Sequence, residues 1–207
     1  MKRCLTASVI AIAARLAIPA AVRAEVQFRP QVALAGGFSV PIRPTDFADL
    51  WKAGFGVSAG LRFWSSNLVS LGVETGYYHH RFDAQAFESR LAAEFPNVNA
   101  DGNDLFVVPV TVVAEAAILP RGSTRPYASV GAGYYHVSGG DAVVSGPGSD
   151  GVEVPTHRGD ALGARLGLGV RTALAPGSSL FLDVTCHVAW IDPRAVTFLP
   201  LRLGVRF

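Results

Sequence analysis

Residues 197–207 read TFLPLRLGVRF, and this stretch decides the fold class. Apolar side chains occupy every second position from Leu199 to Phe207, and Arg202 and Arg206 share the positions between them. Because successive side chains of a β-strand point to opposite faces, the stretch predicts a strand with one apolar face and one face that carries charge.

The same alternation recurs in seven segments upstream. They are residues 28–40, 54–63, 69–78, 105–119, 125–137, 162–171 and 182–190. In the fourth of these segments the sole charge, Glu115, shows which face is polar. After residue 24 the chain has no run of about 18 apolar residues, the length that a membrane-spanning helix needs. The pattern therefore predicts an all-β fold of eight antiparallel strands.

The residues on the polar faces favour a barrel over a soluble β-sandwich. These faces carry glycine, serine and isolated charges of both signs, which suits the crowded interior of a small barrel, and Lys52 is the one lysine after residue 24. The opposite faces are almost purely aliphatic, with aromatic residues near the strand ends. Those at one end are Phe38, Phe55, Tyr77, Phe106, Tyr134 and Trp190, and those at the other are Phe28, Phe63 and Phe207. Two such belts are typical of a barrel that spans a membrane.

Residues 1–24 have the pattern of a secretory signal peptide. Lys2 and Arg3 precede an apolar run, and a stretch of small residues ends at Ala24, after which we expect cleavage. The remaining 183 residues (207 minus 24) suit one domain, residues 25–207. They hold 14 bases (18 minus four in the leader) against 16 acids, and Cys186 is their one cysteine. This balance, without interleaved basic and aromatic residues, gives no support to nucleic-acid binding.

The connections between the expected strands alternate in length. Long connections follow the first, third and fifth strands, and short ones follow the second, fourth and sixth; the fourth connection on the long side, residues 191–195, is short. The long connections are residues 41–53, 83–103 and 138–159, and the short ones are residues 65–67, 120–124 and 175–179. With their flanking residues the four connections on the long side hold 12 acids and six bases. Long acidic loops at one end and tight turns at the other are expected of an up-and-down barrel with its loops outside the cell.

The chain resembles the eight-stranded outer-membrane β-barrel superfamily, which includes the OmpA transmembrane domain, OmpX and the opacity-type surface proteins. The resemblance rests on the ending described above, on Pro126-Tyr127 followed by Gly131 and Gly133, and on Gly167 with Gly169. It implies an eight-stranded antiparallel up-and-down transmembrane β-barrel in the outer membrane of a Gram-negative-type bacterium. Outer-membrane lipid and lipopolysaccharide would then be its surroundings, and we expect a monomer.

The resemblance also implies an assembly signal in the last strand. In this family the alternating apolar positions and the terminal aromatic residue of that strand are read by the barrel assembly machinery. The matching residues here are Leu203, Val205 and Phe207.

We expect the charged residues of the polar faces to form a network inside the barrel. Its members would be Arg62, Glu74, Glu115, Arg165, Arg171, Asp183, His187, Arg202 and Arg206. If the tight turns set the register, Asp183 lies opposite Arg171 with Arg202 on its other side. Glu115 would reach toward Arg165, and Glu74 would pair with Arg62 or a more distant arginine. Buried charges need partners, and eight strands leave an interior that side chains just fill, which argues against a diffusion pore.

The sequence predicts no catalytic, cofactor-binding or metal-ligating residues. A lipid A deacylase type of enzyme would need a His-x-Ser pair and an acid on the lipid-facing wall, and His187 is followed at that spacing by Ala189. We interpret His79, His80 and His136 as polar residues near the outer rim.

One long loop suggests a candidate contact surface. Phe87, Leu91 and Phe95 recur at helical spacing before Pro96. This spacing predicts a short helix that either packs on the barrel mouth or binds a partner.

The function that these features favour is a non-enzymatic surface barrel. It would serve envelope integrity, or adhesion and ligand interaction through its second and third long-side loops. Two alternatives stay open, namely an enzyme that modifies envelope lipids and a narrow channel for small or apolar solutes.

Overall fold

The computed structural model describes residues 30–44, 48, 50–64, 68–91, 99–119, 122–139, 142–146, 152–154, 158–191 and 194–207. The expected signal peptide, Phe28 and Phe95 lie outside these residues. Within the described residues, no helix has the length and apolar character needed to cross a membrane.

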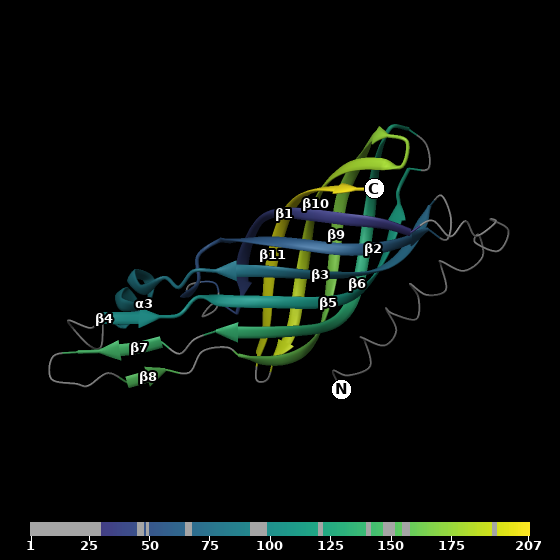
Figure 1. Cartoon of the computed structure of the whole chain (residues 1–207). Coiled ribbons are helices and arrows are strands. Elements are labelled where there is room, and N and C mark those ends of the chain that lie inside the picture. The colour runs from purple at the N-terminus through teal and green to yellow at the C-terminus, as the bar shows by residue number, and fades with distance from the viewer. Residues whose placement is uncertain are drawn as a thin grey trace.

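Eight strands close into an antiparallel barrel, which confirms the expected fold class (Figure 1). They are β1 (Pro30–Arg43), β2 (Gly54–Trp64), β3 (Val69–His80), β5 (Leu105–Ala117), β6 (Thr124–Gly139), β9 (Gly159–Ala175), β10 (Ser178–Ile191) and β11 (Arg194–Arg206). Each of these eight strands pairs with the next one of the eight along the chain, and β1 pairs with β11 to close the barrel. Closure leaves no strand edge in the wall, so every strand's backbone can find partners within the barrel.

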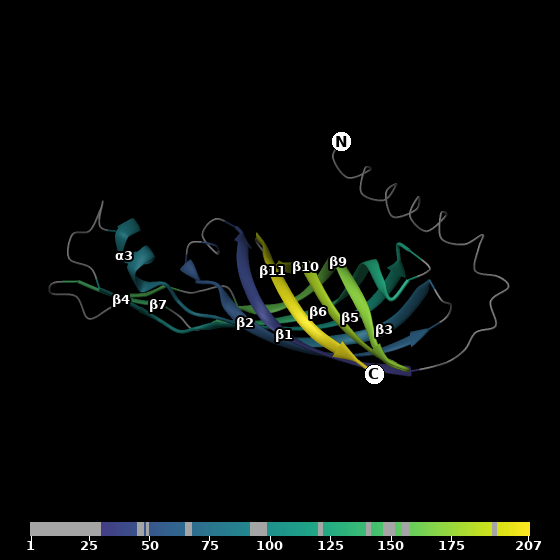
Figure 2. The same cartoon turned by 90° about the horizontal axis from the view of Figure 1, so that it is seen from above.

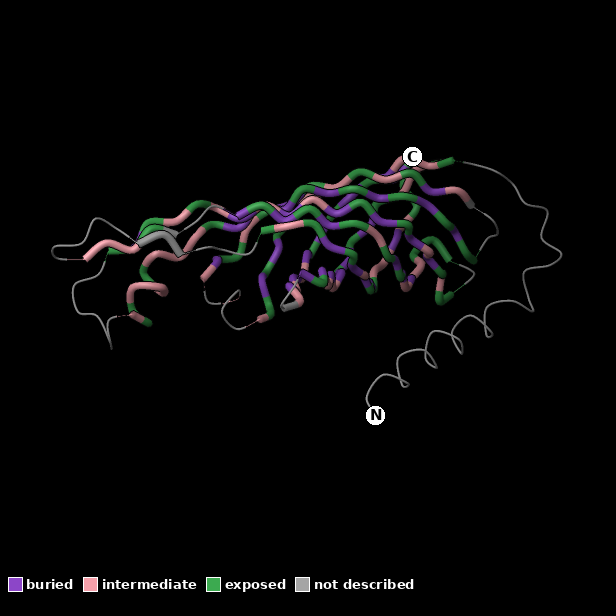
Figure 3. The backbone as a smooth tube through the Cα atoms, turned by 90° about the horizontal axis from the view of Figure 1, so that it is seen from below, coloured by how far each residue is buried: buried purple, intermediate pink, exposed green. Residues whose placement is uncertain are grey.

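Side chains alternate between the two sides of the wall, as the period of two predicts. Figure 3 shows buried and exposed residues following one another along the strands, and β3 alternates almost without exception from Val69 to His80. The exposed side is aliphatic, and Leu162 there is 72% exposed. Five of the residues expected in the first aromatic belt are exposed, and so is Phe207 at the other end. The five are Phe38, Phe55, Tyr77, Tyr134 and Trp190.

The two ends of the barrel differ, and we call them the loop end and the turn end. At the turn end β9 and β10 are joined through a turn in which Gly177 has a φ of 84°, a conformation that glycine adopts at little cost. At the loop end the chain continues beyond the wall into α3 (Ala84–Leu91), β4 (Asn99–Gly102), β7 (Ala142–Ser145) and β8 (Val152–Val154).

The second and third loops on the long side are joined to each other. β4 pairs with β7, and β7 pairs with β8, forming a three-stranded antiparallel sheet. We call this the loop sheet. It extends away from the barrel beside α3, at the end opposite the C-terminus (Figures 1 and 2). The sequence did not predict this pairing, because pairing between segments about 40 residues apart leaves no local pattern.

Candidate functional site

All nine residues of the expected interior network lie buried inside the barrel. Five are arginines and three are carboxylates, so the described lumen has more positive than negative groups. The carboxylates form the centres of two groups of ion pairs, one in the middle of the barrel and one near the turn end.

The middle group is centred on Glu74. Arg202 donates from Nη1 to Glu74 Oε1 at 2.6 Å, and Arg62 and Arg165 donate to the same carboxylate. Arg202 also holds Asp183 with two hydrogen bonds, 2.9 Å from Nε and 2.8 Å from Nη2. Arg202 therefore links the two acids across the lumen.

The group near the turn end is centred on Glu115. Arg206 donates to both of its oxygens, at 3.0 and 2.8 Å, and Arg171 donates to one of them at 3.0 Å. The Arg206 guanidinium also lies 5.6 Å from the centre of the Phe181 ring. The two groups of ion pairs occupy the lumen, and their hydrogen bonds join strands that are far apart in the sequence.

Two of the expected pairs are wrong. Asp183 lies opposite Gly169 and not Arg171, because the β9–β10 hairpin closes at Ala175 and Ser178 and shifts register at Ser178/Ser179. The sequence placed the turn over residues 175–179. The shorter turn and the register shift together move the pairing by two residues. The Tyr127 hydroxyl, rather than the expected Arg171 side chain, donates a hydrogen bond to Asp183 at 3.0 Å.

The expected approach of Glu115 to Arg165 is also wrong. Arg165 lies opposite Gly131, nearer the loop end, and reaches Glu74 across the lumen. Glu115 lies opposite Ser129, nearer the turn end, where Arg171 and Arg206 reach it. Side chains crossing the lumen of a small barrel find partners that pairing along the wall does not predict.

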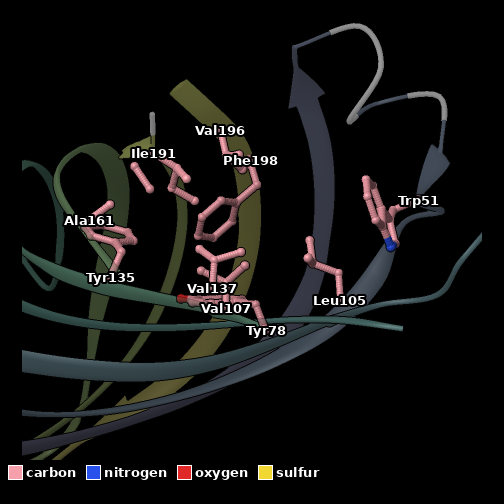
Figure 4. Packing of buried hydrophobic residues seen from close by; sticks show 11 residues of the cluster. Trp51, Tyr78, Leu105, Val107, Tyr135, Val137, Ala161, Ile191, Val196 and Phe198 are labelled. Carbon is pink, nitrogen blue, oxygen red and sulfur yellow. The ribbon is translucent and has the colours of Figure 1, made fainter. Parts of the chain in front are cut away.

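The loop-end half of the lumen is filled by an apolar plug that the sequence did not predict. Figure 4 shows Phe198 pointing toward Tyr78, Val107 and Val137, and the ring centres of Tyr78 and Phe198 are 5.2 Å apart. The buried members of the plug are Trp51, Tyr78, Leu105, Val107, Tyr135, Val137, Ala161, Ala189, Ile191, Val196 and Phe198.

His187 connects the plug to the charged layer. Its ring stacks on Phe198 at 4.8 Å, and hydrogen bonds join its Nδ1 to the Tyr135 hydroxyl at 3.0 Å and its Nε2 to the Thr185 hydroxyl at 3.2 Å. The imidazole thus points into the lumen with both nitrogens engaged, which makes it a packing residue.

Residues 50–52 of the first long-side loop pack against the end of β3 and add Trp51 to the plug. Trp51 is 2% exposed, and its ring meets Phe82 edge to face at 6.4 Å. Backbone hydrogen bonds of 2.8 Å run from Lys52 to Arg81 and from Asp83 to Leu50, and hold this loop against the end of β3. The tryptophan within a loop was the one sequence signal for this contact.

The candidate partner-binding residues of α3 face the barrel mouth in part. Phe87 and Leu91 are half-buried, and the Phe87 ring lies 5.8 Å from the Phe82 ring. Glu88 accepts a hydrogen bond from the Ala100 backbone at 2.8 Å, which ties α3 to β4. These contacts favour packing of α3 at the barrel mouth over binding of a partner by the helix. The loop sheet is then the better candidate for a binding surface.

The residues of the expected assembly signal lie on the exposed side of the wall. Leu203, Val205 and Phe207 are 55%, 40% and 55% exposed. Val32 and Phe207 exchange two backbone hydrogen bonds, 2.7 and 3.0 Å long. Phe207 therefore belongs both to the exposed belt and to the seam between the first and last strands.

Two histidines lie on the exposed side at the loop end, as expected, whereas His80 points into the barrel. His79 stacks on Phe106 at 4.9 Å and is joined to Asp104 at 2.7 Å. His136 is joined to Asp160 at 2.7 Å.

A cavity of about 550 Å³ opens at the junction of the wall and the loop sheet. It is lined by Gly102, Asn103, Asp104, Phe106, Ser138 and Gly139. The described residues contain no cluster of three or more His, Cys, Asp or Glu side chains that could hold a metal ion.

Comparisons with known proteins agree with this architecture. The sequence profile described as "Outer membrane protein beta-barrel domain" matches residues 7–207. Neisserial surface protein A (NspA) has a similar structure, with a TM-score of 0.55, 14% identity, and coverage of 86% of this chain and 95% of NspA. OprG from Pseudomonas aeruginosa gives a TM-score of 0.51 at 10% identity, covering 87% of this chain and 97% of OprG.

Neither structure is named as an enzyme. No curated protein sequence matches the chain. At these identities the two structures establish a shared fold, and the profile match covers nearly the whole sequence. The chain therefore belongs to the family of outer membrane protein beta-barrel domains, and it is an outer-membrane protein.

Proposed function

We propose that this barrel is a surface protein whose loop sheet presents a binding face outside the cell. The observation that carries the proposal is the pairing of β4 with β7, which joins two long loops into one body beyond the membrane wall. Ordering two loops together lowers the entropy that each loses when a partner binds, so a paired sheet suits recognition better than separate flexible loops do.

The closed lumen supports an action at the surface. The plug and the two ion-pair groups fill the interior from the loop end to the turn end, which disfavours the narrow-channel alternative. The interior charges need no chemical role, because each carboxylate is held by arginine. Binding through the loop sheet likewise requires no catalysis.

The charge of the loops indicates the kind of partner. The four long-side connections with their flanks hold 12 acids against six bases. Such a surface repels anionic lipopolysaccharide around it and favours a basic partner, or one bridged by divalent cations. The wall itself contacts membrane lipid, and we propose lipopolysaccharide as its outer-leaflet neighbour.

We also propose that the protein acts as a monomer and that the barrel assembly machinery reads Leu203, Val205 and Phe207. The exposed apolar positions of β11 support the second point, since they lie on the outside of the wall, where an assembly factor can reach them.

The test replaces residues 84–100 and 139–156 with short turns and measures binding of a fluorescent oligolysine peptide to the barrel in phosphatidylcholine nanodiscs. We expect the parent to bind the peptide in a salt-dependent manner and the shortened barrel to lose at least tenfold in affinity while remaining heat-modifiable on gels. A Leu162→Ala variant, which alters the wall and no charge, serves as the control. Equal binding by parent and shortened barrel would contradict the proposal.

A further inference from the structure

A histidine and an aspartate form a pair on the outside of the wall at the loop end. His136 on β6 and Asp160 on β9 lie directly opposite each other, and His136 Nδ1 is 2.7 Å from Asp160 Oδ1. Their side chains are 54% and 59% exposed. A carboxylate at Nδ1 holds the neutral imidazole with its proton on Nδ1, which leaves Nε2 free to accept a proton.

A serine hydroxyl follows at the spacing that this base can serve. Ser138 is exposed and lies two residues beyond His136 on the same face of β6, so their Cα atoms are separated by roughly 6.5 Å. His136-Val137-Ser138 thus has the His-x-Ser spacing that His187 and Ala189 lack. The His187 ring lies in the lumen, whereas His136, interpreted from the sequence as a rim residue, lies on the exposed side.

Space for a substrate lies beside the serine. Ser138 and Phe106, which are opposite each other on β6 and β5, both line the cavity of about 550 Å³ below the loop sheet. The nucleophilic group therefore opens onto a partly apolar space, in contrast to Ser129 on the same strand, which is buried in the lumen.

The position of the group in the membrane indicates the class of substrate. His136 and Ser138 lie two and four residues beyond Tyr134, a member of the exposed aromatic belt. Aromatic belts lie at the level of lipid headgroups, where the ester bonds of lipids also lie. Val110 and Leu162 lie opposite Tyr134 on the neighbouring strands, and Val130 lies four residues nearer the turn end. All three are exposed, so acyl chains can rest against them.

We propose that Ser138, His136 and Asp160 form an acyl-ester hydrolase site for lipids of the outer leaflet. This activity goes beyond the binding role of the loop sheet and does not depend on it. Ser138 Oγ attacks the ester carbonyl carbon while His136 Nε2 takes the hydroxyl proton. The bond to the lipid alkoxide then breaks, and His136 returns the proton to the departing alcohol.

Water completes the cycle. A water molecule loses a proton to His136 and attacks the acyl-serine, which releases the fatty acid and regenerates the Ser138 hydroxyl. Asp160 touches no reacting atom. It is a positioning residue that orients His136 and stabilises the imidazolium formed in each half of the reaction.

The test incubates the purified full barrel in vesicles of phosphatidylethanolamine and lipopolysaccharide and measures released fatty acid by mass spectrometry. Ser138→Ala and His136→Asn should each lower the rate roughly 10³-fold or more. An alkyl fluorophosphonate should add its mass to the parent and not to Ser138→Ala. Ser178→Ala, which removes a half-buried hydroxyl at the turn end, is the control and should keep the parental rate. Heat-modifiable migration shows that each variant is folded.

Asp160→Asn distinguishes positioning from a structural role. It should lower kcat by roughly 10²- to 10⁴-fold with little change in KM, because the imidazole loses the carboxylate that orients it. Asp160→Glu should restore part of the rate.

Three results would overturn the proposal. The first is no fatty-acid release by the folded parent. The second is release that persists in Ser138→Ala. The third is hydrolysis of soluble p-nitrophenyl butyrate without release from the vesicles, which would remove the lipid as substrate.

Discussion

Arg202 and Asp183 lie directly opposite each other on β11 and β10 and are joined by two hydrogen bonds inside the barrel. Both are at least 96% buried, so neither can exchange its partner for water. The same guanidinium reaches Glu74 on β3, on the other side of the lumen. One arginine in the last strand thus holds together strands from both halves of the chain.

Removing either member of this pair should destabilise the barrel. We expect Asp183→Asn and Arg202→Gln each to lower the free energy of unfolding by about 3 kcal/mol. Asp183→Asn leaves the buried Arg202 with Glu74 as its remaining carboxylate, and Arg202→Gln leaves the buried Asp183 carboxylate without a cation to hold it. The double variant should show a coupling of at least about 1 kcal/mol, measured by urea unfolding in lipid vesicles. The cycle of Asp183→Asn with Arg171→Ala should be additive within about 0.5 kcal/mol. Strong coupling of Asp183 to Arg171 would contradict the observed register.

Deleting Phe207 should slow assembly and weaken the closed ring. The deletion removes an exposed aromatic anchor and both backbone hydrogen bonds to Val32 at the seam. Phe207→Tyr keeps the ring and the backbone and should assemble at the parental rate. The measurement is the time course of the heat-modifiable band during refolding into vesicles. Identical time courses for the deletion and the parent would show that the seam closes without Phe207.

Cys186 should be protected from aqueous reagents in the membrane. Its side chain lies on the lipid side of β10, between the buried Thr185 and His187, and opposite Leu166. In membranes a charged maleimide should label the parent poorly. A control with Cys186→Ala and Ser89→Cys, the latter exposed on α3, should label quickly. Brisk labelling of Cys186 would mean that the two sides of β10 are assigned the wrong way round.

The barrel wall could be predicted from the sequence because the alternation of apolar and polar residues lies within each strand. A period of two places Leu199, Leu201 and Leu203 on one face whatever the register, and the same holds for the other strands. For that reason the number of strands, the lipid side and the membership of the interior network follow from the pattern alone.

Contacts across the lumen and between loops could not be predicted in this way. A change of two residues at the β9–β10 turn replaced Arg171 by Gly169 opposite Asp183. The Trp51 contact and the β4–β7 pairing join segments that share no periodic signal. His136 and Ser138 stand at a visible spacing in the sequence, but only the structure pairs Asp160 with His136.

Under the proposed function the protein acts at its outer surface, because the side chains of its described residues fill the lumen. The most direct measurement is the conductance of the purified barrel in planar lipid bilayers, with a large porin as the positive control. We predict no discrete conductance steps for the parent, since the plug around Phe198 and the ion pairs of Glu74 and Glu115 fill the described lumen. Stable, reproducible steps from the folded parent would contradict the closed lumen and with it the assignment of function to the loop sheet.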